Sequence, residues 1–296
     1  MRILITGGTG NVATGMIPRL RAAGHELVIT DLNRLPDVPL FDGLEFVQCD
    51  LQGGVGLEQA VQGCDLVLHT AAWHGIHSGE KTEVDFWRLN VDGTFWTLQA
   101  ARAAGVSRVV FLSSMAWHDA YGKYGFTKRV GEELCEYARR SDGMRYVALR
   151  PADFTPWGND WVNRYGARLL YGGIDRDDVL DCVEAAVRKL EGEPPADEPE
   201  GIVVELVRPD AFGEADIVDW EADPLRACER VFAGSRRLVE KYAIDVSRKP
   251  AVNVARAPTG VLDRVPNRHF GTFLAELQRL DAVAGETTVK AMSCPY

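Results

Sequence analysis

The chain has 296 residues, of which 46% are hydrophobic and 26% are charged, a composition ordinary for a globular protein of one or two domains. The 33 basic residues against 43 acidic ones give a formal net charge of −10. A surface of that sign argues against binding to nucleic acid or to an anionic membrane. A small anionic substrate is not excluded, because it needs only local arginines.

The N-terminal residues already have the pattern of a strand that runs into a glycine turn, so we expect no signal peptide and a cytoplasmic protein. No apolar run approaches the ~18–20 residues of a membrane span. The cysteines are scattered without a Cys-x-x-Cys pair, which predicts reduced buried thiols and no metal site. They are Cys49, Cys64, Cys135, Cys182, Cys228 and Cys294.

Short apolar runs alternate with helical patterns over the first 190 residues. The predicted strands are Ile3–Thr6, Glu26–Thr30, Leu44–Gln48, Leu66–His69, Val109–Leu112 and Tyr146–Leu149. The predicted helices are Val12–Ala23, Leu57–Gln62, Val84–Ala104, Tyr124–Arg140 and Asp178–Leu190. This alternation predicts an α/β fold, a doubly wound parallel sheet covered by helices on both faces. Such sheets bind ligands at the carboxyl ends of their strands.

The alternation weakens after residue 150. Residues 191–201 form a polar, proline-rich stretch typical of a surface loop, and Ile202–Val207 is predicted to return to the main sheet. Asp223–Tyr242 and Phe270–Leu280 are predicted to be helices. We therefore expect a main domain over 1–150, to which 176–208 returns, and a small C-terminal substrate-side lobe over 151–175 and 209–296.

The turn between the first strand and the first helix is rich in glycine. Gly7 and Gly10 can adopt backbone angles closed to other residues, and Gly10 leaves space for a pyrophosphate. The N–H groups that open the helix, at Asn11 and Val12, favour such an anion. Ala13 takes the place of the usual third glycine, where only close helix–strand packing is needed. The turn predicts dinucleotide binding; a plain tight turn is the alternative.

An acidic residue ends each of the next two strands. Asp31 lies 18 residues after Ala13, where a carboxylate can bind both hydroxyls of an adenine ribose. It would repel a 2′-phosphate, so NAD is expected over NADP, although Arg34 can soften that preference. Asp50 and Leu51 end the third strand and can bind the adenine amine. For both acids a turn-forming role is the alternative.

Tyr124 and Lys128 lie four residues apart, on one face of a predicted helix. Oxidation of an alcohol removes its hydroxyl proton while hydride leaves carbon. A free tyrosine, with a pKa of ~10, is a poor base, and a nearby ammonium lowers that value. We predict Tyr124 as the general base, or the acid in reduction, and Lys128 as its tuner and a ribose ligand. Ser114 would hydrogen-bond the reacting oxygen. An ordinary surface pair is the alternative for Tyr124 and Lys128.

Together these segments resemble the extended short-chain dehydrogenase/reductase family, the NAD-dependent sugar epimerases and dehydratases. The matching segments, in order, are Thr6–Ala13, Asp31, Asp50-Leu51, His69–Ala72, Asn90–Thr94, Ser113-Ser114, Tyr124–Lys128, Leu149–Pro151 and Asp177–Val179. The resemblance spans residues 1 to about 190 and implies a Rossmann domain that binds NAD. It also implies that Ala71 contacts the cofactor and that Asn90 braces the site; a purely structural role for Asn90 is equally open.

The chain departs from the family at three points. Ser114 and Tyr124 are 10 positions apart, closer than is usual in members that bind sugar nucleotides. Trp117-His118 replaces the usual Val-Tyr; because the family serine precedes that tyrosine by four, Ser114 is preferred over Ser113. Met115-Ala116 stands where 4,6-dehydratases have an acidic pair, which disfavours dehydration.

The substrate prediction depends on the segment after Pro151 and on the loop after the fourth predicted strand. The segment from Pro151 to Asp177 is short, which favours a substrate smaller than a nucleotide sugar. Residues 167–178 resemble uronate dehydrogenases, in which the arginine at the Arg168 position binds the sugar acid's carboxylate through paired hydrogen bonds. A surface arginine or an interdomain salt bridge is the alternative. His77 and Ser78 can hydrogen-bond sugar hydroxyls, or simply form a polar loop.

The leading hypothesis is an NAD-dependent dehydrogenase acting on a small sugar or sugar acid, and a uronate fits best. The alternative is a sugar or nucleotide-sugar epimerase that keeps NAD bound. A non-catalytic NAD sensor is disfavoured, because Tyr124 and Lys128 are both present. The helices Val84–Ala104 and Tyr124–Arg140 resemble those that pair in family dimers, so a homodimer is expected.

Overall fold

The computed structural model describes residues 1–116, 122–157, 162–192, 200–208, 210–250, 252 and 262–284. Over these residues the chain divides into two compact units. Unit 1 comprises Met1–Pro151, Leu180–Glu205 and Gly260–Asp263, and unit 2 comprises Ala152–Val179, Leu206–Thr259 and Arg264–Tyr296. That the first unit binds NAD and the second the substrate stays a prediction.

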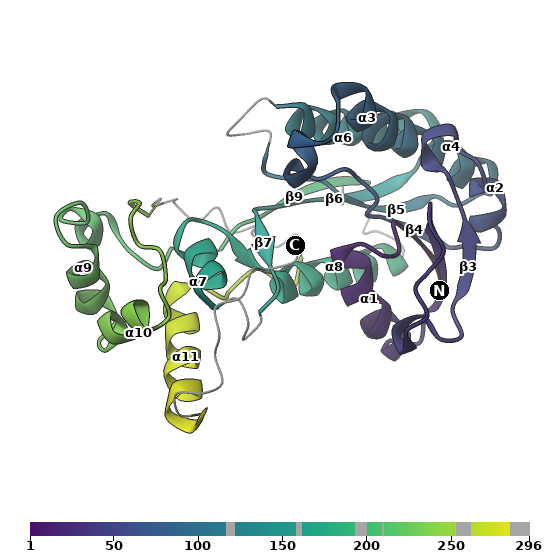
Figure 1. The fold of residues 1–296 in the computed structure, drawn as a ribbon. Coiled ribbons are helices and arrows are strands. Elements are labelled where there is room, and N and C mark those ends of the chain that lie inside the picture. The colour runs from purple at the N-terminus through teal and green to yellow at the C-terminus, as the bar shows by residue number, and fades with distance from the viewer. Residues whose placement is uncertain are drawn as a thin grey trace. The chain divides into compact units, whose positions relative to one another are not determined.

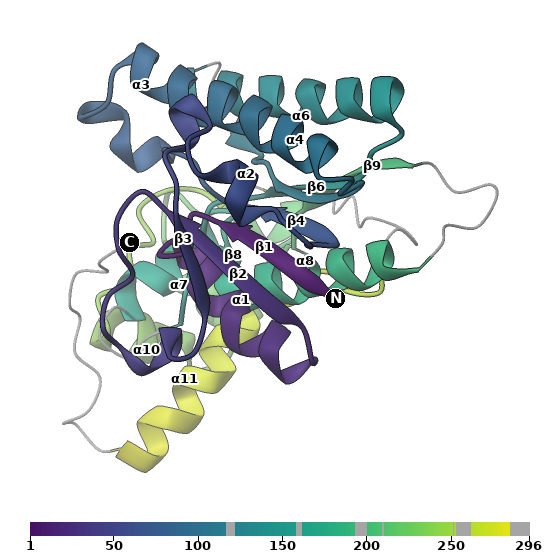
Figure 2. The same cartoon turned by 90° about the vertical axis from the view of Figure 1, so that its right-hand side faces the viewer.

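Unit 1 is built on a seven-stranded sheet with the order β3-β2-β1-β4-β5-β6-β9 (Figures 1 and 2). The strands are β1 (Arg2–Thr6), β2 (Glu26–Asp31), β3 (Glu45–Gln48), β4 (Leu66–His69), β5 (Arg108–Leu112), β6 (Arg145–Pro151) and β9 (Gly201–Leu206). Neighbours from β3 to β6 pair in parallel. Each lies within a few residues of its predicted range, so the doubly wound parallel sheet is confirmed.

The last strand returns to the sheet as predicted. The N–H of Tyr146 donates to the carbonyl of Glu200 at 2.9 Å, and the N–H of Ala152 donates to that of Leu206 at 3.2 Å. Both partners advance by six residues in the same direction (146 to 152 and 200 to 206), so β9 runs parallel to β6. The chain moves outward from β1 to β3 and then crosses to β4 on the other side of β1, so the strand order reverses between β1 and β4. A sheet of this kind opens its ligand crevice at such a reversal.

Helices cover both faces of this sheet. Figures 1 and 2 show α4 (Gly93–Ala103) and α6 (Lys123–Asp142) on one face, with α1 (Asn11–Ala22) and α8 (Arg176–Glu191) on the other. The central strands are apolar throughout because they are covered twice; Leu4, Ile5 and Val67 are fully buried. Short α2 (Leu57–Ala60) lies against α4.

The predicted helix Val84–Ala104 is not uniform. It consists of α3 (Glu83–Trp87), a π-helical segment η4 (Arg88–Asp92) and α4. Thr82 caps the start, accepting a hydrogen bond from the N–H of Asp85 at 3.2 Å. A π-segment has i→i+5 hydrogen bonds, and one of only five residues is too short to be recognised from the sequence pattern.

Unit 2 is mainly helical. It contains β7 (Phe154–Thr155) paired with β8 (Ile174–Asp175), and the helices α7 (Val162–Leu170), α9 (Pro224–Val231), α10 (Ser235–Lys241) and α11 (Phe270–Ala284). Its core includes the fully buried Leu169, Phe270 and Leu277, with Trp220 at 1% exposure. The single helix predicted over Asp223–Tyr242 was wrong, because the chain breaks at Gly234, whose φ is +83°.

Candidate functional site

The glycine turn between β1 and α1 has little room for side chains. Gly7 has a φ of +68°, and a Cβ there would approach the Cα of Ala71 to 2.8 Å. A Cβ on Gly8 would come within 2.0 Å of Ile29. Gly8 must therefore be glycine as well, which the sequence analysis did not predict. Gly10 is the N-cap of α1 and contributes no side-chain hydrogen bond. The N-terminal end of α1, at Asn11, therefore begins at a bare backbone cap that suits an anion.

Asp31 is held beside this turn. Its Oδ2 accepts hydrogen bonds from the N–H of Thr9 at 3.0 Å and from the Thr9 hydroxyl at 2.8 Å. Its other oxygen accepts from the N–H of Asn33 at 3.4 Å. The carboxylate at the end of β2 is thus tied to the glycine turn. Nothing in the sequence predicted that Thr9 would bind Asp31, apart from its position in the glycine turn.

The acid at the end of β3 has a turn-forming role. Asp50 caps the short 3₁₀ helix Leu51–Gly53 and accepts from the N–H of Gln52 at 3.0 Å. Leu51 is buried, and a Cβ on Gly93 of α4 would lie 3.3 Å from it. These contacts account for both residues structurally, and their predicted contact with adenine stays a prediction.

The two serines after β5 have different partners. Ser113 is buried and donates a short hydrogen bond to Oε1 of Glu132. Glu132 is in turn bound by Arg150 through Nε at 2.8 Å and Nη2 at 2.7 Å. The Oγ of Ser114 instead accepts from the N–H of Ala116 at 3.0 Å, and Ser114 is close enough to Tyr124 to act on its pKa in the lowering direction. The structure therefore brings Ser114, and not Ser113, to the tyrosine.

Tyr124 stands in the first turn of α6 among aromatic groups. Its ring centroid lies 4.8 Å from that of His74 and 6.4 Å from that of Phe86. Burial raises the pKa of Tyr124 to about 12, although Ser114 acts in the lowering direction. This direction is opposite to the lowering expected from the four-residue spacing to Lys128.

Lys128 is buried one turn further along α6. Its Nζ donates to the carbonyl of Leu112 at 2.7 Å and lies 5.2 Å from the centroid of the Phe111 ring. Burial lowers the pKa of Lys128 to about 7, against the raising effects of Glu132 and Cys135. Desolvation has the largest effect on the pKa of both groups, and the tuning of Tyr124 by Lys128 stays a prediction.

Asn90 connects three segments around the tyrosine. It lies within the π-helical segment and is 2% exposed. Its Oδ1 accepts from the N–H of Trp73 at 2.8 Å, and its Nδ2 donates to the Trp73 carbonyl and to the Thr127 hydroxyl, each at 3.0 Å. Asn90 thus ties the loop after β4 to α6, next to Lys128. This geometry is that of a brace.

A buried polar chain lies beneath the loop after β4 and was not anticipated. His69 contacts the Thr6 hydroxyl through Nδ1 at 2.8 Å and the Thr94 hydroxyl through Nε2 at 3.0 Å. Burial, with the charge of Lys128, lowers the pKa of His69 to about 3, so the ring is neutral. The hydroxyl of Thr94 also donates to the carbonyl of Asn90 at 2.7 Å. The only sequence signal was a histidine ending an apolar strand.

His77 and Ser78 occupy the 3₁₀ segment Gly75–Gly79 after β4. The Nδ1 of His77 accepts from the N–H of His74 at 3.1 Å, and the Ser78 carbonyl accepts from the Lys123 ammonium at 2.8 Å. His77 therefore has a partner within the loop and Ser78 connects the loop to α6, and their substrate role stays a prediction.

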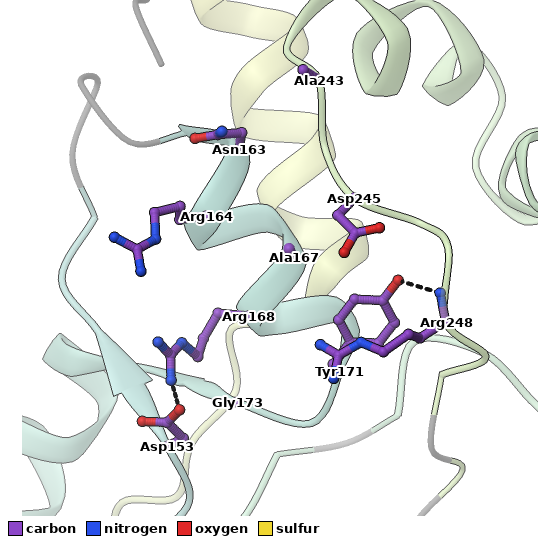
Figure 3. A pocket seen from close by; sticks show the side chains of 10 residues that line it. All are labelled: Asp153, Asn163, Arg164, Ala167, Arg168, Tyr171, Gly173, Ala243, Asp245 and Arg248. Carbon is purple, nitrogen blue, oxygen red and sulfur yellow. Dashed lines mark hydrogen bonds and ion pairs between the residues drawn. The ribbon is translucent and has the colours of Figure 1, made fainter. Parts of the chain in front are cut away.

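Arg168 belongs to unit 2 and lines a pocket there with a volume of about 500 Å³. It lies on α7 and forms an ion pair with Asp153, as the close-up in Figure 3 shows. Arg208 fixes this part of the unit, donating to the carbonyls of Gly173 and Leu169. The pairing with Asp153 was not predicted, since nothing local in the sequence links the two positions.

No cluster of potential metal ligands occurs within the described residues. In the same part of the chain, no helix combines the length and apolarity that a membrane span needs. The described cysteines, all but Cys294, are buried and reduced. Trp117, His118 and the C-terminal residues after 284 lie outside the described residues, as does most of the loop predicted over 191–201.

Comparison with known proteins identifies related sequences. The model of the NAD dependent epimerase/dehydratase family matches residues 3–159. Uronate dehydrogenase of Agrobacterium fabrum is 30% identical over 202 residues, which cover 63% of this chain and 72% of that protein. An uncharacterized protein of Mycobacterium tuberculosis is 30% identical over 186 residues. The match covers 62% of this chain but only 19% of the mycobacterial protein, so the chain spans about a fifth of that relative's length.

Solved structures agree with the sequence comparison. A mutant uronate dehydrogenase from Agrobacterium tumefaciens, in complex with NAD, superposes with a TM-score of 0.55 at 28% identity. The alignment covers 69% of this chain and 76% of that one. The similarity thus extends to the fold of a dehydrogenase whose structure contains NAD.

Proposed function

Because the chain belongs to the NAD dependent epimerase/dehydratase family, we propose that it is an NAD-dependent dehydrogenase of a small polyhydroxylated substrate, a sugar or a sugar acid such as a uronate. The observation that carries the proposal is the proximity of Ser114 to Tyr124, with the buried Lys128 one turn further on α6. This is the arrangement that proton removal from an alcohol requires. The sequence similarity to a uronate dehydrogenase supports the substrate class.

The residues of unit 1 fit an NAD molecule. A Cβ at Gly10 would meet the Gly7 carbonyl at 3.0 Å, so a side chain there would crowd the turn at the start of α1. In our proposal the pyrophosphate binds at Gly10 and Asn11, and Asp31 binds the adenine ribose and selects NAD over NADP. When bound, NAD supplies the hydride acceptor.

In the proposed mechanism Tyr124 removes the proton from the substrate hydroxyl, while Ser114 holds the oxygen within its reach. With a pKa of about 12, the tyrosine is protonated at neutral pH in the ligand-free chain. A nearby positive charge must therefore stabilise its phenolate. We assign this role to Lys128, whose position is secured by Asn90 through Thr127.

Replacement of Tyr124 by phenylalanine tests the mechanism. We expect Tyr124→Phe to lower turnover by about 10²–10⁴-fold, the usual contribution of a general base, with NADH absorbance as the readout in the presence of D-glucuronate. Tyr137→Phe is the matched control, because Tyr137 is an exposed tyrosine on the same helix and should leave turnover unchanged. Near-normal turnover of Tyr124→Phe would contradict the mechanism.

An epimerase is the second candidate, since the family description includes that activity. It would use the same tyrosine and return the hydride to the substrate, so no free NADH would accumulate. NAD that stays bound through purification, together with an isomerised sugar product and no NADH signal, would favour it over the dehydrogenase.

A further inference from the structure

The pocket on unit 2 is lined by charged groups of both signs. It lies between α7 and the segment that follows α10, and Figure 3 shows its lining side chains. Three guanidinium groups, from Arg164, Arg168 and Arg248, stand against two carboxylates, from Asp153 and Asp245. Among these lining groups the guanidinium groups outnumber the carboxylates by one, which suits one singly charged anion. A dianion would leave the half-enclosed pocket with net negative charge.

Arg168 is not a simple anion site, because it already has an acidic partner. It forms an ion pair with Asp153. A Cβ on Gly173 would come within 2.5 Å of its Cγ, so the Arg168 side chain lies directly against the backbone there. A carboxylate ligand that approaches Arg168 also meets Asp153, and repulsion offsets part of the attraction. Recognition of an anion in this pocket thus needs a second guanidinium.

Arg248 is oriented for that role. Its Cζ lies 4.1 Å from the centroid of the Tyr171 ring, and its backbone N–H donates to the Tyr171 hydroxyl at 2.9 Å. Both ends of the residue are therefore anchored to one tyrosine. A guanidinium that stacks by its face keeps its N–H groups in the plane of the fork, where they can bind a carboxylate through two hydrogen bonds.

The segment that carries Arg248 enters the pocket through an unusual backbone turn. Ala243 has a φ of +51°, the only positive φ of a non-glycine residue within the described part of the chain. The N–H of Ile244 donates to the carbonyl of Val239 at 3.0 Å, so the turn ends α10 in a geometry that normally uses glycine. Ala243 itself lines the pocket, and strained positions of this kind gather at ligand sites.

We propose that Arg248, held against Tyr171, is the second carboxylate-binding arginine of this pocket, and that its ligand is a polyhydroxy acid with one negative charge. The Asp153 and Asp245 carboxylates then accept hydrogen bonds from ligand hydroxyls. The inference rests on the proposed function for the substrate class only, since the binding itself is measurable without turnover.

Calorimetric titration of the full chain tests this assignment, with D-glucuronate as the monoanion, glucose 6-phosphate as the dianion and D-glucose as the neutral probe, each with and without NAD. We expect the tightest binding for D-glucuronate. Arg248→Ala should weaken it by about 10–100-fold, the value of a charge-assisted pair. Arg248→Lys should also weaken it, because an ammonium lacks the planar fork. Arg226→Ala, an exposed arginine on α9, should have no effect.

Unchanged binding in Arg248→Ala, or no binding of D-glucuronate to the unmodified chain, overturns the inference. Thermal melting of each variant checks that the fold is retained. The Tyr124→Phe variant separates this result from the proposed function, because it should bind D-glucuronate normally without forming NADH. Arginine-dependent binding with no NADH from the unmodified chain would contradict the dehydrogenase alone. NADH formation with a normal KM in Arg248→Ala would contradict the pocket alone.

Discussion

Adjacent residues after β5 illustrate how neighbouring positions can serve separate purposes. Ser113 donates into the Glu132–Arg150 pair, whose Arg150 also contacts Glu205 at 3.3 Å. Ser114 lies beside Tyr124 and accepts from the N–H of Ala116. Consecutive side chains of an extended segment point to opposite sides, so only one of the two hydroxyls can reach the tyrosine.

This difference predicts distinct phenotypes for the two serines. Ser114→Ala should lower turnover with D-glucuronate by about tenfold or more, because the reacting oxygen loses a hydrogen bond, with little change in unfolding free energy. Ser113→Ala should instead destabilise the chain by about 1–3 kcal/mol, because the buried Glu132 loses a donor. Urea unfolding and steady-state kinetics on both variants give the comparison, and the reverse pattern would contradict the assignment.

The sequence predicts the candidate site residues better than it predicts the residues that hydrogen-bond or ion-pair with them. Asp31 and Gly10 follow strand and helix boundaries, so position alone identifies them. The bonds from Thr9 to Asp31 and from Asp153 to Arg168 depend on how separate segments meet, and no local pattern encodes that. The raised pKa of Tyr124 is similarly a property of packing, since burial outweighs the effects that spacing suggests.

Among the elements, the close approach of α6 to β5 depends on one glycine. A Cβ at Gly131 would come within 2.4 Å of Cζ in the Phe111 ring, which is 1% exposed. Phe111 in turn lies beneath the Lys128 ammonium, so this contact sets the depth of the helix that carries the catalytic candidates.

Gly131→Ala should therefore destabilise the chain by about 1–3 kcal/mol through overpacking, despite a gain of about 1 kcal/mol in helix propensity. It should also lower turnover, because α6 must shift. Gly79→Ala is the control, as its Cβ meets nothing within 4 Å. Thermal unfolding of both variants measures the difference, and a stabilised Gly131→Ala would contradict the tight packing.

Regular elements were predictable because each strand of unit 1 is a short apolar run between polar turns. The boundaries of β4 match the prediction at both ends, Leu66 and His69. Breaks inside helical patterns were not predictable: the π-helical η4 is only five residues long, and Gly234 resembles any glycine tolerated in a helix. The two-residue strands β7 and β8 are too short to carry a pattern.

For the whole molecule, the homodimer remains a prediction, and exposed aromatic side chains are consistent with it. Aromatic rings are exposed on the helices that resemble those of family dimers. Trp87 and Phe126 are 42% and 38% exposed, with ring centroids 6.2 Å apart, and Trp96 on α4 is 42% exposed. Exposed apolar groups in such a cluster commonly mark an interface.

We expect light scattering after size-exclusion chromatography to give the mass of a dimer. Phe126→Glu should shift the chain toward the monomer, because a carboxylate is costly to bury at an apolar interface. Val218→Glu, at a residue that is 71% exposed in unit 2, should not change the mass. A monomeric mass for the unmodified chain would refute the dimer.

The position of β9 limits how this fold can be divided. The stretch that matches the family, residues 3–159, ends before the strand that pairs with β6, and α8 runs from unit 2 into unit 1. A piece of the chain cut at residue 159 would present the bare edge of β6, and one sheet face would keep α1 but lose α8. A bare strand edge invites pairing between copies. The stretch that matches the family model is therefore not a complete folding unit, and moving it into another protein requires that Leu180–Glu205 be moved with it.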